Sequence, residues 1–168
     1  MKLTELLLAE LDREAPKTRR ALEQVPKGKD DWKPHPKSMP LLRLAGLVAA
    51  MPSWVPLILD QESLELNPPK GQGQYQQPTV DQLVSIHDGH VKKAREALSK
   101  RNDDYLMKTK WALQMNGKTV WEDFRYVVLQ DTMNHLAHHR GQLTVYLRLA
   151  GATVPAIYGP SADDQRFA

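Results

Sequence analysis

The chain has 168 residues, a formal net charge of +3 and no cysteine. A length of this order is typical of one domain whose core folds without disulfides, so we expect residues 1–168 to form a single domain. The lack of cysteine excludes disulfides, thiolate zinc sites and cysteine nucleophiles, which leaves histidine and carboxylate as the strong metal ligands. Basic residues are spread along the chain and form no block, so charge does not indicate a nucleic-acid partner.

The start of the chain lacks the long apolar stretch of a signal peptide. No uninterrupted apolar run approaches the roughly 18 residues of a membrane span. We therefore expect a soluble, cytoplasmic protein with no membrane association.

Two helices are predicted in the first third of the chain. The first covers residues 4–25, with Leu7, Leu11 and Leu22 at helical spacing, and Pro16 is expected to kink or restart it. The second covers residues 39–59 and follows Ser38, a favourable N-cap. After a loop over residues 67–78, a third helix is predicted from the capping box Thr79–Gln82 to about residue 100.

Residues 111–121 change from helical periodicity to alternation around Asn116-Gly117, which is a strong hairpin signal. A fourth helix is then predicted over residues 122–150, ended by Gly151, and residues 152–168 form an extended tail that packs along the surface. The predicted fold class is all-α, a four-helix bundle with a small β-hairpin between helices three and four.

Residues 134–143 hold three of the six histidines. His135 and His139 are four residues apart, so both imidazoles lie on one helix face about one turn apart. This spacing allows two ring nitrogens to converge on one divalent metal. Histidines at this spacing also occur as a plain polar stripe or as a hydrogen-bonded core cluster.

The rest of this helix face favours a functional site. Its central positions are polar, and unpaired burial of such groups costs about 1–3 kcal/mol each; they are Asp131, His138, His139, Gln142 and Tyr146. Its ends are apolar, and we expect these side chains to close the face off from solvent; they are Phe124, Val128 and Leu149.

Two other groups of side chains are assigned elsewhere. Trp54 and Trp111 are expected to belong to the core or to a pocket wall. Arg140 and Arg148 point away from His135 on a helical projection, so we expect them to be solvated or to face a second copy of the chain.

The segment from His135 to Arg148, followed by Val154 to Asp163, resembles the C-terminal signature of the DinB (damage-inducible) family. Residues 14–20, residues 32–39 and the Leu44-Ala-Gly pattern are also similar to that family. The resemblance implies a four-helix bundle, usually dimeric, in which three histidines hold a divalent metal. Two of these histidines come from the fourth helix and correspond to His135 and His139.

The third histidine of the family pattern, on the second helix, is replaced here by Leu47. Three outcomes stay open. The site is degenerate, with Leu47 closing it by apolar packing. Alternatively, His87 on the third helix completes the ligand set, although its position favours a core histidine bonded to a carbonyl or carboxylate, since buried polar groups are usually paired. In the third outcome a weak two-histidine site is completed by water, Asp131 or His138.

The resemblance implies two classes of function. In the first, zinc or nickel lowers the pKa of a low-molecular-weight thiol, and the thiolate attacks an electrophilic small molecule, while His138 or Asp131 manages the proton. In the second, the protein is a non-catalytic, stress-associated bundle whose metal site has decayed. A homodimer is expected in both cases.

Overall fold

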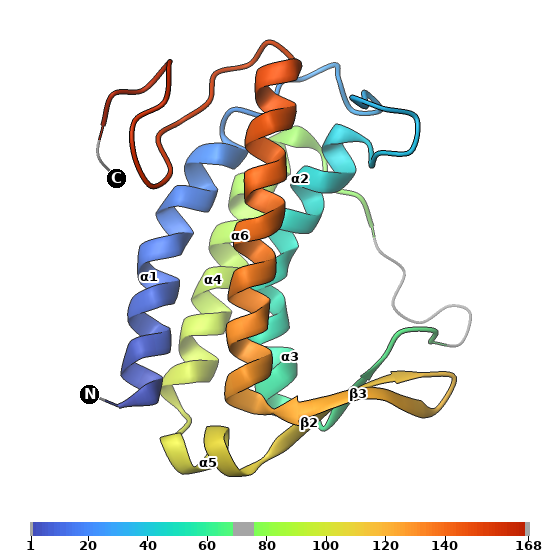
Figure 1. Cartoon of the computed structure of the whole chain (residues 1–168), viewed down its shortest axis with the longest axis vertical. Helices are drawn as coiled ribbons and strands as arrows, with labels where there is room; N and C mark the ends of the chain where they lie inside the picture. Colours follow the sequence, from blue (N-terminus) through green and yellow to red (C-terminus); the bar gives the residue numbers. More distant parts are fainter. Residues whose placement is uncertain (1, 69–75, 167–168) are drawn as a thin grey trace.

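The structure is a computed structural model that describes residues 2–68 and 76–166. Four helical segments pack side by side, as Figure 1 shows. Three are single helices, α1 (Leu3–Leu22), α4 (Leu83–Ser99) and α6 (Arg125–Leu149), and the fourth consists of α2 (Leu41–Ala50) continued by α3 (Trp54–Asp60). The predicted four-helix bundle is confirmed. The middle of the predicted loop over residues 67–78 lies outside the described residues.

A small sheet extends from the lower end of the bundle in Figure 1. The hairpin consists of β2 (Lys110–Met115) and β3 (Lys118–Phe124), which pair antiparallel. Asn116 and Gly117 join them with φ angles of 53° and 73°, the positive values that a type I′ turn requires. The predicted hairpin is therefore confirmed.

Two short elements near the hairpin were not predicted. The strand β1 (Ser63–Glu65) pairs parallel with β2, at the edge opposite β3. The helix α5 (Asp103–Lys108) begins where the Asn102 side chain accepts a hydrogen bond from the Tyr105 amide at 2.8 Å. Three and six residues are too few for either element to show a clear periodicity.

Prolines account for two differences from the predicted helices. Pro16 lies inside an unbroken α1, and its ring is on the exposed side, where water can satisfy the carbonyl that lost its partner. The second predicted helix is instead divided by a 3₁₀ turn at Met51–Ser53, since Pro52 and Pro56 each lack an amide donor. The fourth helix begins at Arg125 because the preceding residues continue the strand β3.

The segment Leu41–Asp60 has the length and hydropathy of a membrane span, contrary to the expectation from the sequence. About 61% of its most apolar window is nevertheless buried inside the bundle. Its apolar side chains contribute to both hydrophobic clusters of the core, among them Leu44, Val48 and Val55. This is the packing of a core element in a soluble helical bundle.

A buried ionic network fixes α6 against α1 and the C-terminal tail. Arg140 is 1% exposed, which corrects the prediction of a solvated or dimer-facing side chain. Its guanidinium donates to a carboxylate oxygen of Glu14 at 2.5 Å, to the Thr18 hydroxyl at 3.0 Å and to the Tyr158 hydroxyl at 2.5 Å. Lys17 donates to the other carboxylate oxygen of Glu14 at 3.0 Å. Arg148, in contrast, stays exposed and pairs with Asp163.

The Glu14 carboxylate is stabilised in its charged form. Burial alone would raise its pKa, but hydrogen bonds from Arg140, Tyr158 and Lys17 outweigh burial and lower the pKa to about 2. A carboxyl group with a depressed pKa stabilises the fold above its unfolded pKa, and this contribution is lost as the pH falls toward 2. The network is therefore intact throughout the neutral range.

We predict that Arg140→Ala lowers the free energy of unfolding by about 3–5 kcal/mol, because it leaves the buried Glu14 carboxylate without its main partner. Chemical denaturation at pH 7 measures this change. Arg148→Ala is the matched control, since an exposed pair contributes about 1 kcal/mol or less. Equal effects of the two substitutions would contradict the structural role assigned to Arg140.

Candidate functional site

The imidazoles of His135 and His139 meet on one face of α6. Their Nε2 atoms are 2.8 Å apart and their ring centroids 4.6 Å apart. Two nitrogens about 2.05 Å from a zinc ion would be about 2.9 Å apart at a right angle and about 3.3 Å apart in tetrahedral geometry. The pair therefore needs only a small opening to place both nitrogens on one ion.

Gln142 sets the hydrogen-bond direction along this face. Its amide nitrogen, which can only donate, lies 2.9 Å from His138 Nε2, and its amide oxygen lies 2.8 Å from His139 Nδ1. The oxygen can only accept, so His139 carries its proton on Nδ1 and leaves Nε2 as an acceptor. His135 then donates its Nε2 proton to His139. The sequence placed Gln142 on this face but did not indicate this orienting role.

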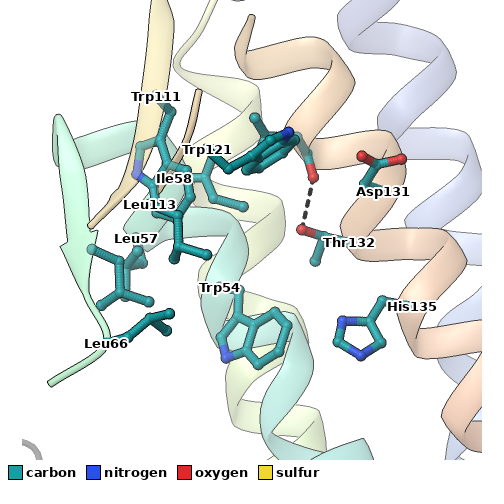
Figure 2. Close-up of a pocket in the computed structure, with 12 residues that line it drawn as sticks. Trp54, Leu57, Ile58, Leu66, Trp111, Leu113, Trp121, Asp131, Thr132 and His135 are labelled. Atoms are coloured by element: carbon teal, nitrogen blue, oxygen red, sulfur yellow. Dashed lines mark hydrogen bonds between the residues drawn. The ribbon is translucent and has the colours of Figure 1, made fainter. Parts of the chain in front are cut away.

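His135 packs against Trp54 of α3, with ring centroids 5.5 Å apart. Partial burial lowers the pKa of His135, and the neighbouring His139 and His138 lower it further. His135 is therefore neutral at pH 7. Its second ring nitrogen, Nδ1, is turned toward the adjoining pocket in Figure 2.

That pocket is a cavity of about 320 Å³ between α3, α6 and the small sheet. Tryptophans from three elements form its walls: Trp54 from α3, Trp111 from β2 and Trp121 from β3 (Figure 2). Asp131, Thr132 and His135 of α6 form its polar side. Trp54 and Trp111 are thus pocket walls, in agreement with the sequence analysis, whereas Trp121 was not singled out.

The buried Arg125 holds the walls of this pocket together. It lies at the first residue of α6 and donates to the carbonyls of Ile58 and Gln61, the latter at 2.7 Å. It also donates to the Thr109 hydroxyl at 3.0 Å, next to the start of β2. One guanidinium thus connects the start of α6 to the end of α3 and to the residue before β2.

Leu47 lies level with the histidine pair. The α2–α3 segment and α6 run antiparallel. Two contacts fix their register: Tyr146 donates to the Met39 carbonyl at 3.3 Å, and Trp54 contacts His135. Leu47 lies about midway between Met39 and Trp54 along the chain and is therefore close to the level of His139. Its side chain is half-buried against the core and supplies no metal ligand.

Among the described residues, no third donor completes the pair. Within residues 2–68 and 76–166, no group of three or more histidine, aspartate or glutamate side chains is arranged to hold a metal ion. Asp131 and His138 are exposed on α6 beside the pair, and His138 is joined to it through Gln142. The residues present therefore do not supply the three protein ligands of a usual catalytic metal site.

His87 belongs to α4 and lies in the core of the protein, with 1% of its surface exposed. Its Nδ1 is 3.3 Å from an Asp88 carboxylate oxygen, and Asp88 also accepts from Arg19 of α1 at 3.1 Å. Burial lowers the pKa of His87 against the opposing effect of Asp88. The structure thus places His87 beside a carboxylate and does not group it with His135 and His139.

The histidine face is more open than its apolar flanks predicted. Val128 is buried, but Phe124 and Leu149 are 36% and 59% exposed. Phe124 belongs to the end of β3 and not to the helix, so its side chain does not follow the helical projection. In the single chain, the polar side chains of this face are therefore reachable from solvent.

Comparison with known proteins agrees with this architecture. The sequence profile of the DinB family matches residues 1–166. The chain belongs to the DinB family. Two solved DinB-like proteins share its fold: one from Bacillus cereus ATCC 10987, with 25% identity and a TM-score of 0.68, and YjoA from Bacillus subtilis, with 19% identity and a TM-score of 0.67. The alignments cover 92% and 96% of this chain, and 97% and 99% of the two structures, in the same order.

A shorter stretch of this DinB-family chain is similar to the uncharacterized protein YrdA of Bacillus subtilis (strain 168). The two are 51% identical over 37 residues, which is 22% of each protein. This match covers about a fifth of that relative, so it adds local similarity and no information on activity.

Proposed function

We propose that this DinB-family protein is a thiol S-transferase in which the His135–His139 pair activates a low-molecular-weight thiol. The observation that carries the proposal is the 2.8 Å contact between the two Nε2 atoms at the edge of a cavity of about 320 Å³. A neutral base beside a concave apolar pocket is the arrangement that a nucleophilic substitution requires. The cytoplasm supplies such thiols.

The chemistry follows from the hydrogen-bond order along α6. His135 Nδ1 faces the pocket and takes the proton of the bound thiol. The His135 imidazolium then forms a charge-assisted bond through Nε2 to His139, whose own proton stays on Nδ1 and is donated to the Gln142 oxygen. The sulfur electron pair forms a C–S bond with the electrophile, the C–X pair departs with the leaving group X, and His135 returns the proton to X.

Two neighbouring side chains support this step. Asp131 lies one turn before His135 on the pocket side, and as an exposed carboxylate it can exchange the proton with solvent. His138 accepts from the Gln142 amide nitrogen and so keeps the amide oxygen directed at His139. We therefore assign proton exchange with solvent to Asp131 and a positioning role to His138.

We predict that His135→Ala lowers thiol transfer to a model electrophile, such as 1-chloro-2,4-dinitrobenzene, by about 100-fold or more, since base catalysis contributes roughly 10²–10⁴-fold. The pKa of His135 lies below its ordinary value of about 6.5. We therefore expect kcat/KM to stay constant above pH 6.5 and to decrease at lower pH, where His135 becomes protonated. His35→Ala, in an exposed loop, is the control. Unchanged kinetics of His135→Ala would overturn the proposal.

We also propose that the pair binds divalent metal weakly, because Leu47 stands where the family pattern has a third histidine. The two converging Nε2 atoms support weak binding of zinc or nickel. The apolar side chain of Leu47 supports an affinity well below that of a three-ligand site. No step of the transfer above depends on this ion.

We predict that Leu47→His raises zinc affinity by at least 100-fold, since it adds a ligand level with a pair that is already assembled. Calorimetry with zinc chloride on untagged protein measures the change. His135→Ala in the Leu47→His background should remove the gain, and Leu47→Gln, which adds a polar group of similar size, is the matched control. Tight zinc binding by the wild type that is lost on His87→Ala would instead assign the third ligand to His87.

A second function is favoured by Leu47 alone. In this case the bundle is a non-catalytic, stress-associated protein whose metal site has decayed while its fold is kept. The transfer assay separates the two proposals directly, because this second protein would give the same rate with and without His135.

The partner that we propose is a second copy of the chain. Val145 and Leu149 lie one turn apart on the outer face of α6 and are 57% and 59% exposed. A dimer that covers them would remove this apolar surface from water. We predict a dimer by light scattering at micromolar concentration and a monomer for Val145→Glu/Leu149→Glu; a monomeric wild type would contradict the proposal.

A further inference from the structure

We propose that the three-tryptophan cavity is a binding site for a neutral, flat aromatic group of about two fused rings. The electrophile of the proposed reaction would then carry such a group, and in this respect the inference rests on the proposed function. The binding itself depends only on the cavity and its walls.

The size of the cavity sets the size of the group. An engineered cavity of about 150 Å³ holds one benzene ring, and this cavity of about 320 Å³ is roughly twice as large. Sites for small molecules begin at about 300 Å³. A fused bicyclic aromatic is therefore the largest rigid group that the cavity holds without rearrangement.

The walls favour an aromatic group over a polar one. Trp54, Trp111 and Trp121 surround the cavity in Figure 2, and leucines of α3, β1 and β2 fill the gaps between them. Indole faces attract other aromatic rings in offset or edge-on contacts. The hydroxyl of Thr132 already donates its proton to the Val128 carbonyl at 2.8 Å, so it can accept from a ligand but has no proton left to donate to one.

Charge selects against an anionic ligand. Among the described residues that line the cavity, Asp131 is the only acidic one. Within residues 2–68 and 76–166, no lysine or arginine lines the cavity to balance a carboxylate. A neutral ligand is therefore accepted with its polar end toward His135 and Asp131, while a carboxylate at the same end is repelled.

Calorimetry with two matched probes tests the inference. We expect 2-naphthol to bind the wild-type protein saturably at one site per chain. We expect 2-naphthoate, which has the same ring system and a negative charge, to bind at least about fivefold more weakly, consistent with about 1 kcal/mol or more between unit charges at 4 Å. Asp131→Asn should remove most of this difference without weakening 2-naphthol.

Variants locate the site. Trp121 is 37% exposed, so Trp121→Ala leaves the core intact and is expected to weaken 2-naphthol binding at least about tenfold. Leu113→Trp, which fills the cavity, should abolish binding. Trp32→Ala is the control, because Trp32 packs against Tyr146 with ring centroids 5.9 Å apart and does not line this cavity.

The outcomes are distinguishable from those of the transfer assay. Unsaturable 2-naphthol binding, equal affinity for 2-naphthoate, or full binding by Trp121→Ala would each overturn the inference. Saturable binding that follows the variants, together with no transfer activity, would keep the site and reject the proposed reaction. Transfer activity without 2-naphthol binding would keep the reaction and reject this substrate class.

Discussion

The burial of Arg140 is the constraint on which the arrangement of the bundle depends. A guanidinium at 1% exposure is tolerated only when its hydrogen bonds are satisfied, and its acceptors come from α1 and the C-terminal tail. These bonds fix both the depth and the rotation of α6. While Arg140 turns toward α1, His135 on another side of α6 contacts Trp54 of α3 and lines the cavity.

A second buried arginine, Arg125, anchors the other end of the same helix. Arg125 joins the start of α6 to the end of α3 and to the residue before β2. The helix that carries the histidines is thus fixed near its first residue and in its second half. The rings of His135 and His139 lie between these two anchors, on a rigid part of the helix, which suits a site whose atoms must keep a set distance.

Local patterns predicted much of the fold. Asn116-Gly117 indicated the hairpin and Gly151 the end of α6, because each signal depends on the backbone angles of the residue itself. Arg140 was misassigned because its partners are remote in sequence: Glu14 is 126 residues away and Tyr158 is 18. A helical projection shows the direction of a side chain but not whether a buried carboxylate lies within hydrogen-bonding distance of it. The same limitation applies to β1, whose three residues form a strand only because β2 lies beside them.

The candidate site was likewise predicted only in part from the sequence. The pairing of His135 with His139 follows from their spacing, and the lack of a ligand at Leu47 could be seen from the family pattern. The cavity could not be predicted, since its tryptophans come from α3, β2 and β3 and meet only in the folded chain. Gln142 was placed on the correct face, but its role depends on which of its amide atoms faces which ring.

The histidine pair and the cavity respond differently to local opening of the structure. The histidine pair belongs to one helix and needs no other element to keep its spacing, whereas the cavity loses a wall whenever the hairpin separates from the bundle. The outer strand β3 is largely exposed and is held mainly by its ladder with β2, the kind of segment that opens at a lower free energy than the core. Separation of the hairpin from the bundle would therefore open the cavity without changing the spacing of His135 and His139, which is set within α6 alone.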